Sequence, residues 1–176
     1  MTEQFRPINV YLRYVEGIRL GVYAVRDFKR GDFLFSATGR VVPEQSEFSL
    51  QIDWDRHLDV YPPARYLNHS CDPNTGVKTN ELGFPDFYAF RDIAKDEEVR
   101  YDYAMTEYRH YERLRPELDF DLTCHCGSAR CRGKFGYYSE LPALPKEAYS
   151  GFISDYLVRD DKASGTIPES QVVAME

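Results

Sequence analysis

Four cysteines place the strongest constraint on how this chain can fold. Three lie within eight residues, as Cys124-His-Cys126-Gly-Ser-Ala-Arg-Cys131, and Cys71 lies far upstream. The segment around the three is polar, so it offers little apolar cover for buried or free thiols, which are the alternative interpretation. Four thiolates around one tetrahedral Zn²⁺ form a closed structural site, and the number of cysteines fits one such site. We therefore favour zinc, and Gly127 permits the sharp turn that a Cys-X-Cys step requires.

A metal at these cysteines would join two distant parts of the chain. If Cys71 is the fourth ligand, the 124–131 segment is tied to the loop that carries Asn68 and His69, and metal binding helps to assemble a composite site. His125 is flanked on both sides by a cysteine and can rarely reach the same metal, so it is not included among the ligands.

Composition narrows the class of protein. The chain has 176 residues, 43% hydrophobic and 15% aromatic, which suits one folded domain with a core. Its 29 acidic and 22 Lys or Arg residues give a net charge of −7, which suits a basic polypeptide partner better than nucleic-acid phosphates. No apolar run approaches the roughly 18 residues of a membrane span, and the N-terminus lacks signal-peptide features. We expect a soluble intracellular protein, cytoplasmic or nuclear, without direct binding to membrane or nucleic acid.

Short apolar runs separated by glycines predict a mainly β fold with a few short helices. We expect strands over 10–15, 22–26, 33–37, 48–52, 76–79, 87–90 and 98–103. Side chains two apart in a strand share a face, so Tyr101 and Tyr103 should point the same way. Apolar spacing predicts helices over 104–115 and, despite Gly151, over 145–158.

Three ordered blocks carry a family resemblance. They are Arg65-Tyr-Leu-Asn-His-Ser-Cys-Asp-Pro-Asn74, Asp96-Glu-Glu-Val-Arg-Tyr-Asp-Tyr103 and the cysteine block that ends in Cys131-Arg-Gly133. The chain resembles the SET-domain protein lysine methyltransferases, whose signatures are R-[FY]-x-N-H-S-C-x-P-N, G-E-E-L-x-[FY]-D-Y and a post-SET C-x-C-x4-C. Upstream, Gly17-Ile-Arg-Leu-Gly21-Val-Tyr-Ala24 is similar to the family's cofactor loop and first strand. The resemblance covers roughly residues 8 to 136.

The resemblance implies a SET-domain β-clip, with small curved sheets, a pseudoknot near the active site and a zinc-bound post-SET segment. It divides the chain into a SET domain over 8–115, a post-SET zinc segment over 116–137, a C-terminal helix within 138–158 and a flexible tail over 159–176. The implied protein is a stand-alone enzyme, with no cysteine-rich region before the SET domain.

The resemblance also implies an activity, methyl transfer from S-adenosylmethionine to a lysine of a basic protein, histone-like or ribosomal. Tyr103 matches the family's catalytic tyrosine, and Tyr101 matches the position that controls the number of methyl groups. A tyrosine there is similar to members that stop after few methyl groups, so we predict mainly monomethylation. The retained Tyr103 argues against a catalytically weak SET-like module that only binds peptide or cofactor, and the acidic balance argues against a zinc-stabilised structural or nucleic-acid adaptor.

The other site residues follow from the same resemblance. Asn68 and His69 match the pair that holds the donor, and Arg19, Leu20 and Gly21 match the cofactor loop. Phe48 is a further candidate for donor contact. After the cysteines, Phe135 and Tyr137 are candidates to cover the adenine of the donor or to form one wall of the lysine channel. The predicted zinc ligands are Cys71, Cys124, Cys126 and Cys131.

Three positions depart from the family pattern. Arg19 stands where the cofactor loop has its middle glycine, and Asp96 replaces the glycine of G-E-E. Ala37 stands where many members carry a tyrosine of the lysine channel. The last departure removes one aromatic wall and so bears on the predicted monomethylation.

Overall fold

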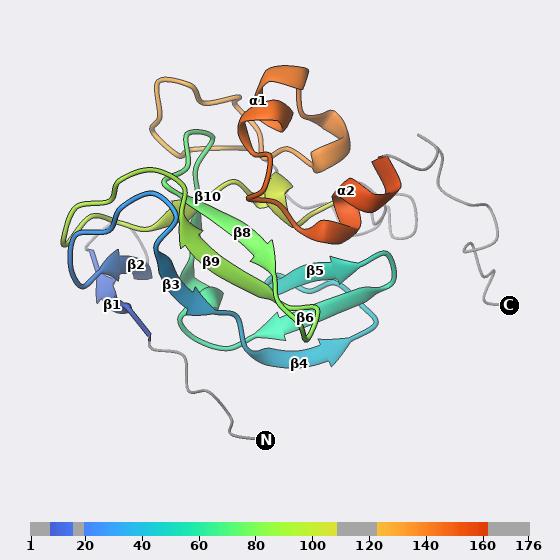
Figure 1. Cartoon of the computed structure of the whole chain (residues 1–176), viewed down its shortest axis with the longest axis horizontal. Coiled ribbons are helices and arrows are strands. Elements are labelled where there is room, and N and C mark those ends of the chain that lie inside the picture. The colour runs from blue at the N-terminus through green and yellow to red at the C-terminus, as the bar shows by residue number, and fades with distance from the viewer. Residues whose placement is uncertain (1–7, 16–19, 109–122, 162–176) are drawn as a thin grey trace, which may run out of the picture.

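The computed structural model describes residues 8–15, 20–108 and 123–161, and its fold is mainly β, as predicted (Figure 1). The strands are β1 (Val10–Tyr14), β2 (Leu20–Ala24), β3 (Phe33–Ser36), β4 (Gly39–Val42), β5 (Ser49–Asp53), β6 (Arg56–Val60), β7 (Asn68–His69), β8 (Thr75–Thr79), β9 (Pro85–Ala89) and β10 (Arg100–Tyr101). The helices are the 3-10 turns η1 (Ala64–Tyr66), η2 (Tyr103–Met105) and η4 (Tyr138–Glu140), and the α-helices α1 (Ala143–Ala148) and α2 (Asp155–Asp161).

The described strands form three small sheets, ordered β1-β2, β3-β9-β8-β10-β7 and β4-β6-β5. In the five-stranded sheet β10 lies between β7 and β8, which follow one another in the chain, and Tyr101 is in register with both His69 and Thr75. The connection from β7 to β8 therefore passes across β10. The backbone N–H of Ser70 donates to the carbonyl of Tyr101 at 2.9 Å, and that of Asn74 donates to the carbonyl of Arg100 at 3.2 Å. This is the crossing that the family resemblance implies.

Three strands, β4, β6 and β7, were not expected from the sequence. Residues 40 and 56 are exposed arginines, so β4 and β6 lack a continuous apolar run, and β7 has only two residues. β10 is shorter than expected because Asp102 caps the turn η2, its side chain accepting from the backbone N–H of Ala104 at 3.2 Å. Strand alternation therefore stops at Tyr101, and a 3-10 turn positions Tyr103.

The prediction of one helix over 145–158 was wrong. Two short helices, α1 and α2, flank a turn in which Gly151 adopts a φ of +77°, a conformation that glycine reaches without steric cost. The helix expected over 104–115 is a 3-10 turn in its described part, and its remainder, like most of the predicted tail, lies outside the described residues.

The C-terminal segment packs on the five-stranded sheet, with α1 and α2 along one side of it in Figure 1. The backbone N–H of Val77 donates to the carbonyl of Phe152 at 3.1 Å. A Cβ on Gly76 would lie 2.6 Å from the Cβ of Phe152, so the close approach requires glycine. The N–H of Ser154 donates to the carbonyl of Met105 at 2.9 Å, which brings the segment to the turn after β10.

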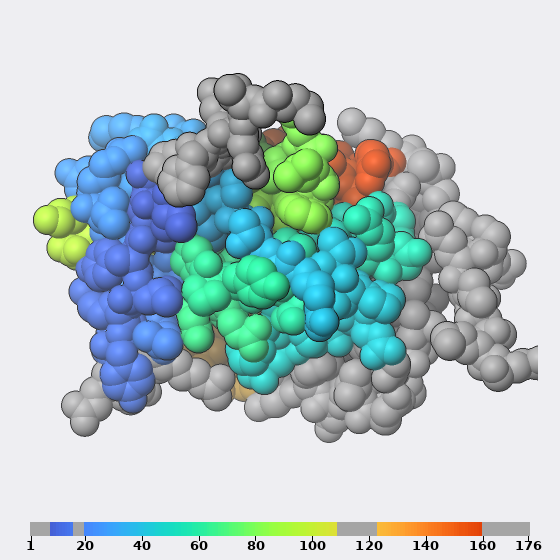
Figure 2. Space-filling model, turned by 90° about the horizontal axis from the view of Figure 1, so that it is seen from below, coloured from blue at the N-terminus to red at the C-terminus, as the bar shows by residue number. Residues whose placement is uncertain are grey.

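The view from below shows a different face, formed by the β1–β2 sheet and the β4–β6–β5 sheet (Figure 2). Aromatic rings of the five-stranded sheet contribute to the core: Phe35 stacks on Phe87 with centroids 4.8 Å apart, and the centroids of Phe87 and Tyr101 are 5.3 Å apart in an edge contact. Tyr101 is thus a core residue as well as a site candidate.

Of the helices that the structure describes, none has the length and apolar character needed to span a membrane.

Candidate functional site

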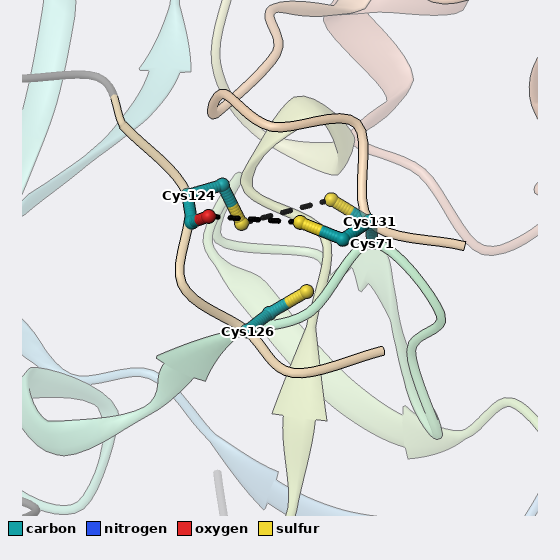
Figure 3. A group of neighbouring side chains, drawn as sticks. All are labelled: Cys71, Cys124, Cys126 and Cys131. Atoms are coloured by element: carbon teal, nitrogen blue, oxygen red, sulfur yellow. Dashed lines mark hydrogen bonds between the residues drawn. The ribbon is translucent and has the colours of Figure 1, made fainter. Parts of the chain in front are cut away.

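The fold gathers all four cysteines at one point (Figure 3). Three lie on the segment after residue 123 and Cys71 on the connection from β7 to β8, and the four Sγ atoms lie within 4.8 Å of one another. The Sγ atoms of Cys71 and Cys124 are 3.8 Å apart, which equals the edge of a tetrahedron with Zn–S distances of about 2.3 Å. His125 is exposed and is not part of the cluster.

Two backbone N–H groups donate to sulfur atoms of the cluster. The N–H of Arg132 donates to Sγ of Cys71, and the N–H of Gly133 donates to Sγ of Cys131, each at 3.4 Å. Gly127 and Gly133 have φ of +72° and +76°, so both take the left-handed turns that bring the ligands together, as expected for Gly127. Geometry, donor chemistry and surroundings all fit a structural zinc ion.

A buried carboxylate, that of Asp102, ties the cysteine segment to the turn after β10. Arg132 donates to it through both Nη atoms, at 2.7 and 2.8 Å, and the Tyr149 hydroxyl donates to it at 2.8 Å. The side chain of Asp102 has no exposure, and that of Arg132 is 21% exposed. Such charge-assisted, bidentate hydrogen bonds are among the strongest in proteins. Asp102 therefore joins the site to the cysteine segment and to the C-terminal segment at once.

His69 connects the metal cluster to the tyrosines. The backbone N–H of Tyr103 donates to its Nδ1 at 3.3 Å, so Nε2 carries the proton and faces Sγ of Cys71 at 3.2 Å. Burial lowers the pKa of His69 to about 4, against the opposing charge of Asp102 and with a smaller contribution from Arg132, so the ring is neutral near pH 7.

Three rings pack into an aromatic group beside this histidine. The ring of Phe135 lies 4.9 Å from that of His69 and 5.5 Å from that of Tyr103, and the Tyr101 and Tyr103 rings are 5.1 Å apart. The hydroxyl of Tyr103 donates to the carbonyl of Leu67 at 3.2 Å. Burial raises the pKa of Tyr103 to about 12 and that of Tyr101 well above its usual value, so both phenols stay neutral and can orient a substrate.

Asn68, in β7, contacts the first residue of β2. Its Nδ2 donates to the carboxylate of Glu98 at 2.7 Å and to the carbonyl of Leu20 at 3.4 Å. A Cβ on Gly21 would lie 2.8 Å from Oε1 of Glu98, so a larger residue there would displace the Glu98 carboxylate. Arg100 also donates to Glu98, through Nε at 2.6 Å, and to the carbonyl of Cys126 at 3.0 Å.

The structure does not bring every predicted residue to this group. Arg19 lies outside the described residues. Phe48 packs under the guanidinium of Arg65, whose Cζ lies 3.9 Å from the centroid of the Phe48 ring. Within the described chain, no ring contact joins Phe48 to Tyr103 or Phe135. Tyr137 caps η4, half-buried, and Ala37 is buried after β3.

Four residues of the site were missed in the sequence. Glu98 and Arg132 lie inside the quoted blocks, but the blocks do not reveal their partners. Glu98 accepts from Asn68 and Arg100, and Arg132 donates to Asp102. Tyr149 and Glu107 lie outside the blocks, and only the fold brings Tyr149 to Asp102 and Glu107 to the Thr106 hydroxyl.

Comparisons with known proteins agree with this geometry. Residues 19–104 match the family model of the SET domain. In Arabidopsis thaliana, the putative histone-lysine N-methyltransferase ASHH4 is 28% identical over 140 residues, which cover 66% of this chain and 36% of that protein. In Saccharomyces cerevisiae, the histone-lysine N-methyltransferase, H3 lysine-4 specific, is 38% identical over 94 residues, 50% of this chain and 8% of that protein.

A solved structure supports the fold. The crystal structure of KRYPTONITE in complex with mCHG DNA and SAH aligns with a TM-score of 0.58 at 22% identity, over 74% of this chain and 30% of that chain. The fold and the site thus define a SET domain with a cysteine cluster after it. Residues 19–104 of this chain form a SET domain, and the chain spans well under half the length of the curated relatives named above.

We predict that Asp102→Asn lowers the free energy of unfolding by about 3 kcal/mol, because the partly buried Arg132 then loses its counter-charge. Tyr149→Phe should cost only about 1 kcal/mol, the value of one hydrogen bond. Urea unfolding followed by circular dichroism measures both.

The matched control is Asp72→Asn, because Asp72 is 53% exposed and pairs with Arg130 at 3.4 Å at the surface. An exposed pair contributes little, so this change should stay within about 0.5 kcal/mol. An Asp102→Asn effect as small as that of the control would contradict the central position given to Asp102.

Proposed function

We propose that this chain is a protein lysine methyltransferase that uses S-adenosylmethionine as methyl donor. The observation that carries the proposal is the placement of the Tyr101–Tyr103 pair against the Asn68–His69 strand, across the β7–β10 pairing. The names of the relatives, histone-lysine N-methyltransferases, and the SAH in the KRYPTONITE complex support it.

The donor would lie between β2 and the aromatic group. Asn68 and His69 would hold it from β7, Leu20 and Gly21 would offer backbone atoms from β2, and Phe135 would cover it from the cysteine segment. Gly21 has no side chain to add to the close packing of Glu98, Tyr23 and Asn68 around it. Arg19 and Phe48 remain predictions as donor contacts.

The tyrosines would help to bring the substrate lysine, the methyl acceptor, into its reactive form and orientation. A free lysine has a pKa of about 10.4 and attacks only as the neutral amine. A buried aromatic channel beside the cationic sulfonium lowers that pKa, because desolvation and a like charge both disfavour the ammonium. Tyr103, fixed through its bonds to Leu67 and His69, would orient the amine in line with the methyl group, which is where most of the rate gain of such a displacement arises.

Tyr101 would limit the product mainly to monomethyl-lysine. Its phenol is buried beside Tyr103 and takes up space that phenylalanine would leave open to an amine that already carries methyl groups. The smaller Ala37 acts in the opposite direction, since it removes a wall that many family members have.

Four cysteines would hold one structural Zn²⁺, which supplies a fixed tetrahedral junction between the 124–131 segment and Cys71. That junction would keep Phe135 over His69 and Arg132 on Asp102.

The substrate would be a basic protein. With 29 acidic and 22 Lys or Arg residues the chain favours a basic tail, and the relatives' names favour histones over the ribosomal alternative.

We expect the protein to transfer labelled methyl groups from S-adenosylmethionine to at least one protein on an array of core histones and ribosomal proteins. Tyr103→Phe should lower the rate about 100-fold or more, since it removes the orienting hydroxyl at the reacting amine. The exposed Tyr14, 69% accessible, gives a matched control in Tyr14→Phe, which should keep full rate.

Mass spectrometry of the product should find mainly monomethyl-lysine. Full turnover in Tyr103→Phe would refute the assignment of that residue. Donor binding measured by calorimetry, with no labelled protein at all, would instead favour a SET-like binding module.

We predict about one zinc ion per chain in the purified protein, measured by atomic emission. Cys126→Ser should lose the zinc and lower the melting temperature, because ligand binding contributes to folding. His125→Ala changes the neighbouring side chain, which is exposed, and should keep both zinc and melting temperature. Loss of zinc in His125→Ala, or its retention in Cys126→Ser, would show that the ligand set is different.

A further inference from the structure

Glu107 is a buried acid that the proposed function does not use. The residue is 9% exposed and lies four positions after Tyr103. Its Oε1 accepts from the backbone N–H of Gln51 at 2.9 Å, and its Oε2 accepts from the side-chain amide of Gln45 at 3.2 Å. No basic side chain within the described ranges pairs with it. A buried carboxyl without a counter-charge is costly, so its position calls for a physical reason.

Two hydroxyls connect Glu107 to the tyrosine pair. The Thr106 hydroxyl lies 3.2 Å from Oε1 of Glu107, and the Tyr101 hydroxyl lies 3.4 Å from the same Thr106 oxygen. Thr106 is fully buried, and Tyr101 is 2% exposed. The Tyr101 ring lies beside that of Tyr103. The series of hydroxyls therefore leads from the proposed position of the substrate amine to the Glu107 carboxylate.

We propose that Glu107 is the final acceptor of the proton that the substrate ammonium must lose, reached through the hydroxyls of Tyr101 and Thr106. This inference rests on the proposed methyltransferase function. Glu107 acts through Tyr101 and does not itself touch the substrate.

The proton transfer is balanced in three concerted moves. The ammonium gives a proton to the Tyr101 oxygen as the Tyr101 proton passes to the Thr106 oxygen and the Thr106 proton passes to the Glu107 carboxylate. The amine, now with a lone pair, attacks the methyl carbon, and the electrons of the broken carbon–sulfur bond stay on sulfur. Glu107, protonated at the Oε1 that accepts from Thr106, then loses this proton to bulk solvent, which restores the carboxylate for the next turnover.

The surroundings of Glu107 suit this role. Burial raises its pKa to about 7, against the hydrogen bonds from Gln51 and Thr106, so it can both take up and release a proton near neutral pH. Among the described residues, three phenols face it, those of Tyr101 on β10, Tyr103 in η2 and Tyr156 on α2. From the β5–β6 pair, Gln51 contributes its N–H, and His57 is in register with Gln51.

The test is the pH dependence of kcat/KM between pH 6 and 9.5, on the protein that the wild-type chain labels most strongly, with core histones as the first probe. The wild-type profile should rise to a plateau just above neutral pH. Glu107→Gln keeps an acceptor oxygen for Gln51 but cannot take a proton. It should be about 100-fold slower at pH 7.5 and should gain tenfold per pH unit up to pH 9.5, since it can use only the lysine that is already neutral.

Two further variants separate proton transfer from packing. Thr106→Val keeps the shape and the carboxyl but breaks the series, so it should copy the profile of Glu107→Gln, whereas Thr106→Ser should restore the plateau. Asp86→Asn changes another buried carboxyl, 2% exposed and bonded to Asn80, and should keep the wild-type profile.

Turnover with parallel profiles in wild type, Glu107→Gln and Thr106→Val would overturn this inference and leave the proposed function intact. Absence of turnover in the wild type on every protein tested would overturn both.

Discussion

The buried Asp102 carboxylate is the interaction on which the site depends. A carboxylate without exposure requires strong partners, and it finds them in Arg132 from the cysteine segment and Tyr149 from the C-terminal segment. Because Asp102 lies between Tyr101 and Tyr103, satisfying its charge also fixes the turn that carries the tyrosines. The cysteine cluster repeats the same linkage through His69, whose Nε2 faces Cys71. Two independent attachments therefore hold the same short segment against β7.

The cysteine cluster and the Asp102–Arg132 pair hold different parts of the site. Cys71 lies two residues after His69 in the connection that crosses β10, so a metal at the cluster would fix the crossing itself. Arg132 follows Cys131 directly and reaches the other end of β10. Phe135, three residues further, then covers His69 and Tyr103. A chain that lost either attachment would leave the aromatic group open on the side where the donor is proposed to bind.

Much of this arrangement could be predicted from the sequence, because short motifs with fixed spacing specify local geometry. The structure brings the four cysteines together and places the Asn68–His69 strand beside the two tyrosines. Contacts between residues that are distant in the sequence could not be predicted. Arg132 could have paired with any acid, and no sequence pattern near Glu107 indicates that this residue is buried. Helix spacing over 145–158 was misleading because its apolar residues pack on the sheet as two short helices around the Gly151 turn. Strand alternation likewise did not place Tyr103, since the Asp102 cap ends β10 first.

The central claim is that the cysteine cluster completes the donor site by holding the 124–135 segment against Asn68 and His69. The most direct measurement is the dissociation constant of S-adenosylmethionine, by calorimetry, for metal-replete protein, for protein treated with a chelator, and for the treated protein given zinc again. Binding should weaken at least about tenfold, or about 1.4 kcal/mol, without the metal and should recover when zinc returns. Equal affinity in all three samples, with the stripped protein still folded, would contradict it.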